Sequence, residues 1–212
     1  YVWRGLTLND GLVAQPSVDV AHPSGAGLNV WGNFDIDDYD DTLESSEFSE
    51  VVLTLYYNIP VENVDLSVGY IEYMFPATSA TDPGTLGTRE LYASVGQSLS
   101  AYGWNETLDG FSWGLFAAYD FDEVEDYYAN LSLTYGYDVN EQFSLECGAL
   151  IGYAGSDWSE LVNGGTDSGF NEWQLSLAGT YGITETVDLG AFIAYVDTVD
   201  EDVLPTQDTD VY

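Results

Sequence analysis

The chain has 212 residues, with 37 Asp and Glu against two Arg, no Lys and a formal net charge of −35. This length suits one domain with a substantial core or a single barrel. The charge excludes nucleic acid as a partner, because phosphate binding needs basic groups that the chain lacks. It also demands screening by salt or by bound cations, which indicates a halophilic habitat, divalent-ion binding, or both. Because 45% of the residues are hydrophobic and 15% aromatic, we do not expect a disordered chain.

The sequence contains no run of apolar residues long enough for a transmembrane helix. It shows no signal peptide either, since Tyr1 already lies in strand-like sequence, so we expect a mature or trimmed chain. Cys147 is the single cysteine and His22 the single histidine, which argues against a zinc site and against a positioned Ser–His pair. We therefore expect no catalytic residues and no enzyme.

Residues 127–153 show the pattern that organises the chain. Leu131 and Leu133 alternate with Ser132 and Thr134, and the alternation resumes after a polar link at 139–142. Successive side chains of a strand point to opposite faces, so each run has one apolar and one polar face. Each run is about as long as the roughly 9–11 residues with which a tilted strand crosses a bilayer, and aromatic residues stand at both ends. The pattern predicts a transmembrane β-hairpin.

The same alternation predicts the other strands. They cover residues 1–8, 12–21, 28–36, 51–59, 64–70, 90–96, 111–119, 127–138, 143–153, 173–183 and 187–195, with a last one beginning at 211–212. The first turn is predicted at Asn9-Asp10-Gly11, and Pro16 predicts a bulge or a break in the second strand. Long acidic loops alternate with short turns, except at 9–11, which is too short, and at 99–110, which is too long.

The predicted fold class is therefore all-β, an antiparallel transmembrane β-barrel of about 12 strands. We expect residues 1–212 to form a single outer-membrane barrel domain with an incomplete last strand. A soluble β-sandwich or lipocalin-like barrel also alternates, with its apolar face inside. The aromatic residues at the strand ends favour the membrane barrel over that alternative.

Several short motifs resemble those of a known family. They are the opening Tyr1-Val2-Trp3-Arg4-Gly5, Trp31-Gly32-Asn33, the strand Val68-Gly69-Tyr70-Ile71-Glu72-Tyr73 followed by Pro76, and Glu90-Leu91-Tyr92-Ala93. Together they resemble the TorF-type porin family of bacterial outer-membrane β-barrels, most clearly over residues 1–100. The chain departs from that family in lacking Lys and in ending at Tyr212 without a terminal strand that closes on an aromatic. The resemblance implies a barrel in the bacterial outer membrane, at the cell surface.

In a membrane barrel the apolar positions face lipid. We expect this of Leu131, Leu133, Leu145, Leu175, Leu177, Leu189 and Ile193. The opposite positions then line the lumen and supply nine acids: Asp19, Asp35, Asp65, Glu90, Asp120, Asp138, Glu146, Glu172 and Asp188. Arg4 is expected to point inward and pair with one of them, because lipid exposure would cost about 2–4 kcal/mol at mid-membrane. Arg89 is expected at the outer rim.

Acidic rings select cations, so the leading hypothesis is a narrow, cation-favouring passive diffusion channel. Any single one of these carboxylates could instead be a structural group that is hydrogen-bonded to Ser, Thr or Tyr.

Two acidic clusters in predicted loops could hold Ca²⁺, which takes six to eight oxygen ligands. They are Asp37, Asp38, Asp40 and Asp41, and Asp122, Glu123, Glu125 and Asp126. Neither has EF-hand spacing, and a solvated halophilic surface explains them equally well. The alternative function is a structural barrel that self-assembles into arrays or tubes, in which Ca²⁺ bridges these loops between copies. The expected partners are thus the outer-membrane bilayer, small cations and other copies of the chain.

Overall fold

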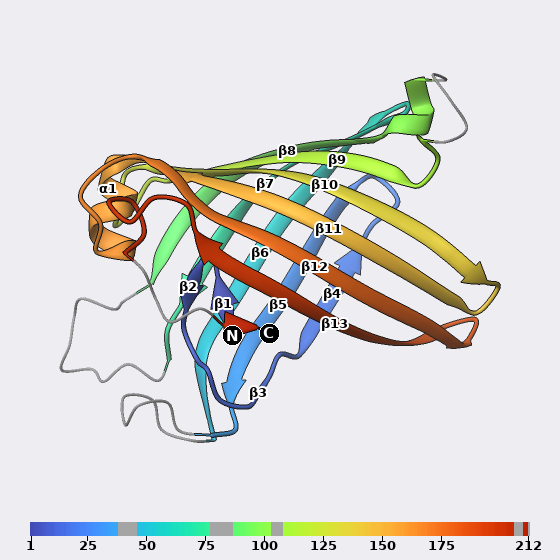
Figure 1. The fold of residues 1–212 in the computed structure, drawn as a ribbon, viewed down its shortest axis with the longest axis horizontal. Coiled ribbons are helices and arrows are strands. Elements are labelled where there is room, and N and C mark those ends of the chain that lie inside the picture. The colour runs from blue at the N-terminus through green and yellow to red at the C-terminus, as the bar shows by residue number, and fades with distance from the viewer. Residues whose placement is uncertain (38–45, 77–86, 103–107, 206–209, 212) are drawn as a thin grey trace.

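The computed structural model describes residues 1–37, 46–76, 87–102, 108–205 and 210–211. Twelve of its strands form one antiparallel sheet in the order β14-β13-β12-β11-β10-β9-β8-β7-β6-β5-β3, with β4 also paired to β5. This sheet curls into a barrel (Figure 1). Within the described ranges no ladder joins β13 and β14 to β3 and β4, so the barrel is not closed. The all-β, antiparallel, twelve-strand prediction is confirmed.

The wall consists of long strands joined in sequence order. They are β3 (Val13–Ala14), β4 (Ser17–Ala21), β5 (Ala26–Asp35), β6 (Glu47–Val61), β7 (Val64–Met74), β8 (Thr88–Ser98), β9 (Phe111–Asp120), β10 (Tyr127–Asn140), β11 (Phe143–Ala154), β12 (Gly169–Thr184), β13 (Val187–Thr198) and β14 (Asp210–Val211). β3 and β4 are one strand interrupted at Pro16, which has no N–H to give to the ladder, as the sequence predicted.

The connections gather at two ends of the barrel. One end, which we call the loop end, carries the long links after β5, β7, β9, β11 and β13, including α1 (Ser156–Trp158) and the helical turn η4 (Ser159–Asn163) (Figure 1). The other, the turn end, carries the short links after β4, β6, β10 and β12. The link between β8 and β9 is the exception expected from the sequence: it lies at the turn end yet is long, and it contains the short helix η2 (Leu99–Tyr102).

The predicted first wall strand is wrong. Residues 1–8 form a separate hairpin of β1 (Val2–Trp3) and β2 (Leu6–Thr7), with Val2 opposite Thr7 and Trp3 opposite Leu6. Its two-residue turn is Arg4-Gly5, with φ of 48° and 86°. A tight hairpin of this kind needs positive φ at both turn positions, which Asn-Gly or Asp-Gly usually supply, so Arg-Gly gave no turn signal. The predicted turn at 9–11 instead leads out of the hairpin into the wall.

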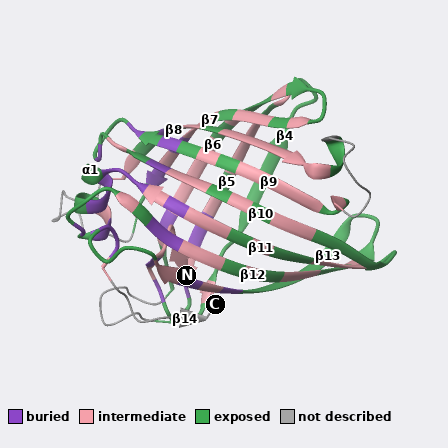
Figure 2. Cartoon of the chain, turned by 45° about the horizontal axis from the view of Figure 1, so that its top comes forward, coloured by how far each residue is buried: buried purple, intermediate pink, exposed green. Residues whose placement is uncertain are grey.

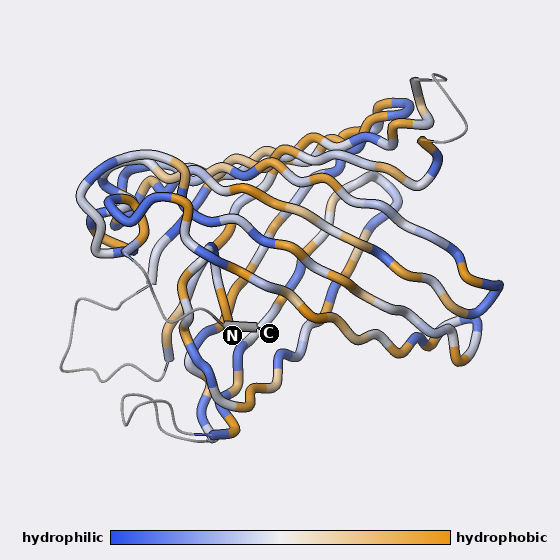
Figure 3. Tube along the Cα trace, in the orientation of Figure 1, coloured by the Kyte–Doolittle hydropathy of each residue, from blue (hydrophilic) through white to orange (hydrophobic). Residues whose placement is uncertain are grey.

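The outer face of the barrel is apolar. Of the seven predicted lipid-facing positions, six have exposed fractions between 46% and 64%, and Leu145 is half-buried on the same face. The register aligns these positions across strands, for example Leu131 with Leu115 and Leu133 with Ala149. Ser132 and Ser176 lie on the opposite, inward face (Figure 3 shows the alternation). A soluble barrel has the reverse arrangement, with its apolar side chains inside.

Among the described residues, no helix has both the length and the apolar character needed to cross a membrane.

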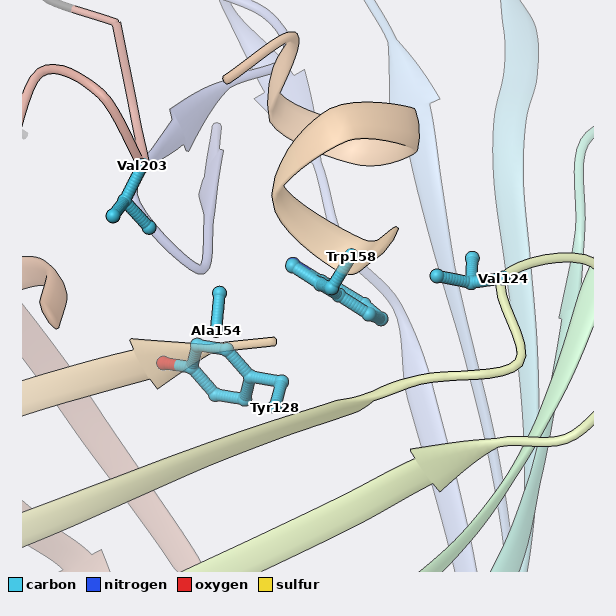
Figure 4. Close-up of a cluster of buried hydrophobic side chains, with 5 residues drawn as sticks. All are labelled: Val124, Tyr128, Ala154, Trp158 and Val203. Carbon is cyan, nitrogen blue, oxygen red and sulfur yellow. The ribbon is translucent and has the colours of Figure 1, made fainter. Parts of the chain in front are cut away.

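Burial is concentrated at the loop end, while the turn-end half is intermediate or exposed (Figure 2). The buried apolar cluster comprises Val124, Tyr128, Ala154, Trp158 and Val203. Figure 4 shows Trp158 reaching from α1 toward Tyr128 and Ala154, with Val124 and Val203 on either side. Among the described residues, the core therefore lies at one end of the barrel.

The outward orientation of Leu133 predicts a depth-dependent penalty for charge. Leu133→Arg should lower the free energy of unfolding in phospholipid vesicles by about 2–4 kcal/mol, because the guanidinium meets hydrocarbon. Thr134→Arg, one residue along on the inward face, is the matched control and should cost much less. Urea unfolding of the vesicle-bound protein measures both, and equal costs would contradict the assigned faces.

Candidate functional site

The tip of the N-terminal hairpin lies inside the loop end, and Arg4 anchors it there. The Arg4 guanidinium donates from Nη1 to Oε1 of Glu90 at 2.7 Å and from Nη2 to Oε2 of Glu90 at 2.8 Å. The side chains of Arg4 and Glu90 are 9% and 0% exposed. Tyr73 completes the group, donating its hydroxyl to Oε2 of Glu90 at 3.1 Å. A buried bidentate ion pair of this kind neutralises the charge of Arg4 and also fixes the position of its side chain.

Aromatic rings enclose the guanidinium. Its Cζ lies 4.4 Å from the ring centroid of Tyr128, 4.6 Å from Trp158 and 4.7 Å from Trp3. Such contacts stabilise a desolvated cation. Burial by itself opposes the charge of Arg4, but Tyr73 and Glu90 outweigh it, so the pKa of this turn residue is raised and Arg4 stays charged.

The backbone of the hairpin turn is also held. Asn171 on β12 donates to the carbonyl of Arg4 at 2.8 Å, and Asn163 donates to Asn171 at 2.7 Å. A Cβ on Gly5 would lie 2.7 Å from Leu204 and 2.8 Å from Glu172, so only glycine fits this close approach. The hairpin is therefore locked between the wall and the loops that follow β11 and β13.

The two ends of the hairpin segment bind two further buried acids, Glu50 and Asp35. Tyr1 donates its hydroxyl to Oε2 of Glu50 on β6 at 3.0 Å. Asn9 donates to Asp35 at the end of β5 at 2.7 Å, and Asn33 donates to the same oxygen at 2.9 Å. Residues 1–9 thus form a plug, by which we mean this segment as it lies inside the loop end of the barrel.

The structure divides the predicted luminal acids into two groups. Asp35, Glu90, Asp120 and Glu172 are buried at the loop end. The hydrogen bonds of Asp35 and Glu90 are described above. Glu172 accepts from Tyr128 and Asn171. Asp120 accepts from the hydroxyl of Thr88 and from the backbone N–H groups of Asp122 and Val124. These four match the alternative interpretation of the sequence, in which the carboxylates are hydrogen-bonded structural groups.

The second group lies nearer the turn end on inward-facing positions. Its members, Asp19, Asp65, Asp138, Glu146 and Asp188, are all exposed. Asp19 accepts from the hydroxyl of Tyr56 at 2.9 Å. Arg4 lies apart from this group and pairs with Glu90. Arg89 is exposed at the loop end, where its Nε lies 3.5 Å from Oε1 of Glu72 and its Nη1 lies 3.2 Å from Oδ2 of Asp122. Neither arginine is therefore a partner of these turn-end acids.

The acidic clusters predicted to bind Ca²⁺ are only partly described. Asp37 is exposed, while Asp38, Asp40 and Asp41 lie outside the described residues. In the second cluster Asp126 accepts from the backbone N–H groups of Asp157 and Trp158, at 2.9 and 3.1 Å, and so fixes the start of α1. Glu123 and Glu125 are exposed. No group of three or more His, Cys, Asp or Glu side chains within the described ranges could hold a metal ion, and calcium-bridged assembly stays a prediction.

Sequence reasoning missed most of the residues around the plug. Tyr128 lies on a predicted strand and Trp158 in a predicted loop, whereas Glu50, Tyr73 and Asn171 lie just beyond the predicted strand ends. Nothing in the pattern linked these five residues. The one available signal was Arg4 itself, a cation in an apolar stretch that had to find an acid. His22, expected on a turn, is exposed there, and its Nδ1 lies 2.9 Å from Oγ of Ser24.

The comparisons with known proteins identify the family. The model of a family described as "Bacterial protein of unknown function (Gcw_chp)" matches residues 1–211. The chain belongs to this family. Among solved structures it is similar to an anion-selective porin from Comamonas acidovorans, with 14% identity and a TM-score of 0.42 over 93% of this chain and 53% of that chain. The chain thus spans about half the length of that porin, and no curated protein matches it.

The buried ion pair predicts a large effect from a small substitution. Glu90→Gln should lower the free energy of unfolding by about 3–5 kcal/mol, because it leaves Arg4 buried without a counter-charge. Arg89→Gln, which removes the exposed pairs to Glu72 and Asp122, should cost about 0–1 kcal/mol. Urea unfolding in vesicles compares the two, and similar losses would show that the plug does not depend on the Arg4–Glu90 pair.

Proposed function

We propose that this protein is a bacterial outer-membrane barrel that lets small cations diffuse through a narrow, partly plugged interior. The observation that carries the proposal is an exposed apolar outer face combined with a polar inner face whose turn-end half is acidic and lies apart from both arginines. Membrane-spanning barrels have apolar side chains outside and polar ones inside. The proposal includes no catalytic step.

The charge of the interior supports a preference for cations. The chain has only two basic side chains besides His22, and both Arg4 and Arg89 lie at the loop end in ion pairs. The inward-facing acids toward the turn end therefore keep an uncompensated negative potential. Rings of acidic side chains favour cations and exclude anions. This negative potential would repel anions throughout the turn-end half of the barrel interior.

The plug supports a narrow path. It occupies the loop end, where buried residues concentrate, so conduction depends on the space that remains between the plug and the wall (Figure 2). A small barrel is often filled by its own side chains, and here an N-terminal hairpin adds to them. We expect a small conductance in the native protein.

The native Cys147 offers a direct test of the membrane setting. It lies opposite Tyr135 and Leu177 on the outward face and is exposed. A nitroxide attached to Cys147 before folding into vesicles should relax strongly with oxygen and weakly with a water-soluble nickel chelate. In the Cys147→Ser background, a label at Ser132→Cys on the inward face should show the reverse. Strong nickel relaxation at Cys147 would mean that this face is in water.

Planar-bilayer recording in a salt gradient tests the channel. The reversal potential should indicate cation preference, and the triple variant Asp19→Asn, Glu146→Gln and Asp188→Asn should bring the cation-to-anion permeability ratio close to one. Glu160→Gln, an exposed acid on η4, is the control and should leave the ratio unchanged. Glu90→Gln should raise the conductance by loosening the plug. Anion preference, or no conductance from a correctly folded barrel, would reject the proposal.

A further inference from the structure

A cavity of about 480 Å³ lies beside the plug at the loop end. Its lining includes Trp3 and Leu6 of the hairpin, Trp158 and Val162 of the α1–η4 segment and Phe75 after β7. Wall strands β6, β7 and β8 and the link between β9 and β10 supply most of the rest. The lining is mainly aromatic and aliphatic. Ligand cavities in proteins have this volume and this character, with a few polar groups that orient the ligand.

One buried carboxylate lines this cavity. Glu50 is 4% exposed, and its Oε2 accepts the hydroxyl of Tyr1 at 3.0 Å. Within the described ranges no hydrogen bond reaches its Oε1, and no ion pair reaches Glu50, because Arg4 is bound by Glu90. A carboxylate that is removed from water needs a donor or a cation to offset its desolvation. Glu50 thus has an unused acceptor at an apolar cavity.

The charge of the protein selects among ligands of the right size. A net charge of −35 repels anionic amphiphiles such as carboxylates, and Glu123 adds a further acid to the cavity lining. A cation is attracted by the same field. Trp3, Phe75 and Trp158 offer ring faces and edges that suit an aromatic group.

We propose that this cavity binds a small aromatic amine, with its ring against the aromatic lining formed by Trp3, Phe75 and Trp158 and its ammonium group at Oε1 of Glu50. The cavity lies between the plug and the wall, but the binding proposal does not depend on conduction. It does depend on the plug, because the hairpin supplies one wall. Amine recognition at the loop end would make this end of the barrel a receptor surface for a cationic solute.

Binding can be measured with the folded full chain in lipid nanodiscs. The probes are 2-phenylethylamine, 3-phenylpropionate and 2-phenylethanol, which share a ring and differ in charge. Tryptophan emission reports binding, since two of the six tryptophans line the cavity. We expect saturable binding of the amine at least about tenfold tighter than that of the carboxylate, which corresponds to about 1.4 kcal/mol, with the alcohol between them.

Two variants and one control assign the site. Glu50→Gln should abolish the preference for the amine over the alcohol, whereas Asp157→Asn, which removes one exposed charge at the same end, should preserve it. Val162→Phe should weaken all three probes by filling the cavity. Heat-modified gel mobility checks that each variant is folded.

The wild-type comparison alone decides the case if a variant fails to fold. Equal binding of amine and carboxylate, or no saturable binding of the amine, would overturn the proposal. So would an amine preference that survives Glu50→Gln in the folded protein. None of these results would bear on cation conduction, which bilayer recording measures separately.

Discussion

The loop end of this barrel depends on one buried ion pair, between Arg4 and Glu90. Removing both charges from water costs several kcal/mol, so the pair forms only with full hydrogen bonding and close surroundings. The two-pronged contact to Glu90, the hydroxyl of Tyr73 and the three nearest rings meet that requirement. Once Arg4 is fixed, the hairpin has a single position, in which Asn171 of β12, itself bound by Asn163 of η4, donates to its backbone.

This arrangement assigns different work to acids that look alike in the sequence. At the loop end, Asp120 and Asp126 bind backbone N–H groups and shape the loops that place Val124 and Trp158 in the core. These carboxylates are structural, and their charge is offset by donors. Toward the turn end, Asp19 and Glu146 face an interior that lacks basic groups, so their charge remains available to act on solutes. Structural and electrostatic roles are thereby separated along the barrel axis.

The plug links the two proposals made for this protein. The segment that narrows the interior also provides Trp3 and Leu6 to the apolar cavity and brings Tyr1 to Glu50. A cavity next to a plug exists only because the hairpin does not fill the whole cross-section of the loop end. The barrel wall contributes a rigid frame and Glu50 of β6, while the aromatic lining of the cavity comes largely from the N-terminal segment and two long connections.

The sequence by itself determined the wall. Alternation with a period of two is a local property, so it located the strands, their outward faces around Leu131 and Leu133, and the break at Pro16. Tertiary structure alone decided the plug, because Arg4 and Glu90 are 86 residues apart and Arg4 and Asn171 are 167 apart. The pattern of a strand carries no information about such partners. It likewise could not show that residues 1–8 leave the wall, because the positive φ of Arg4 is sustained by those distant contacts rather than by the local sequence.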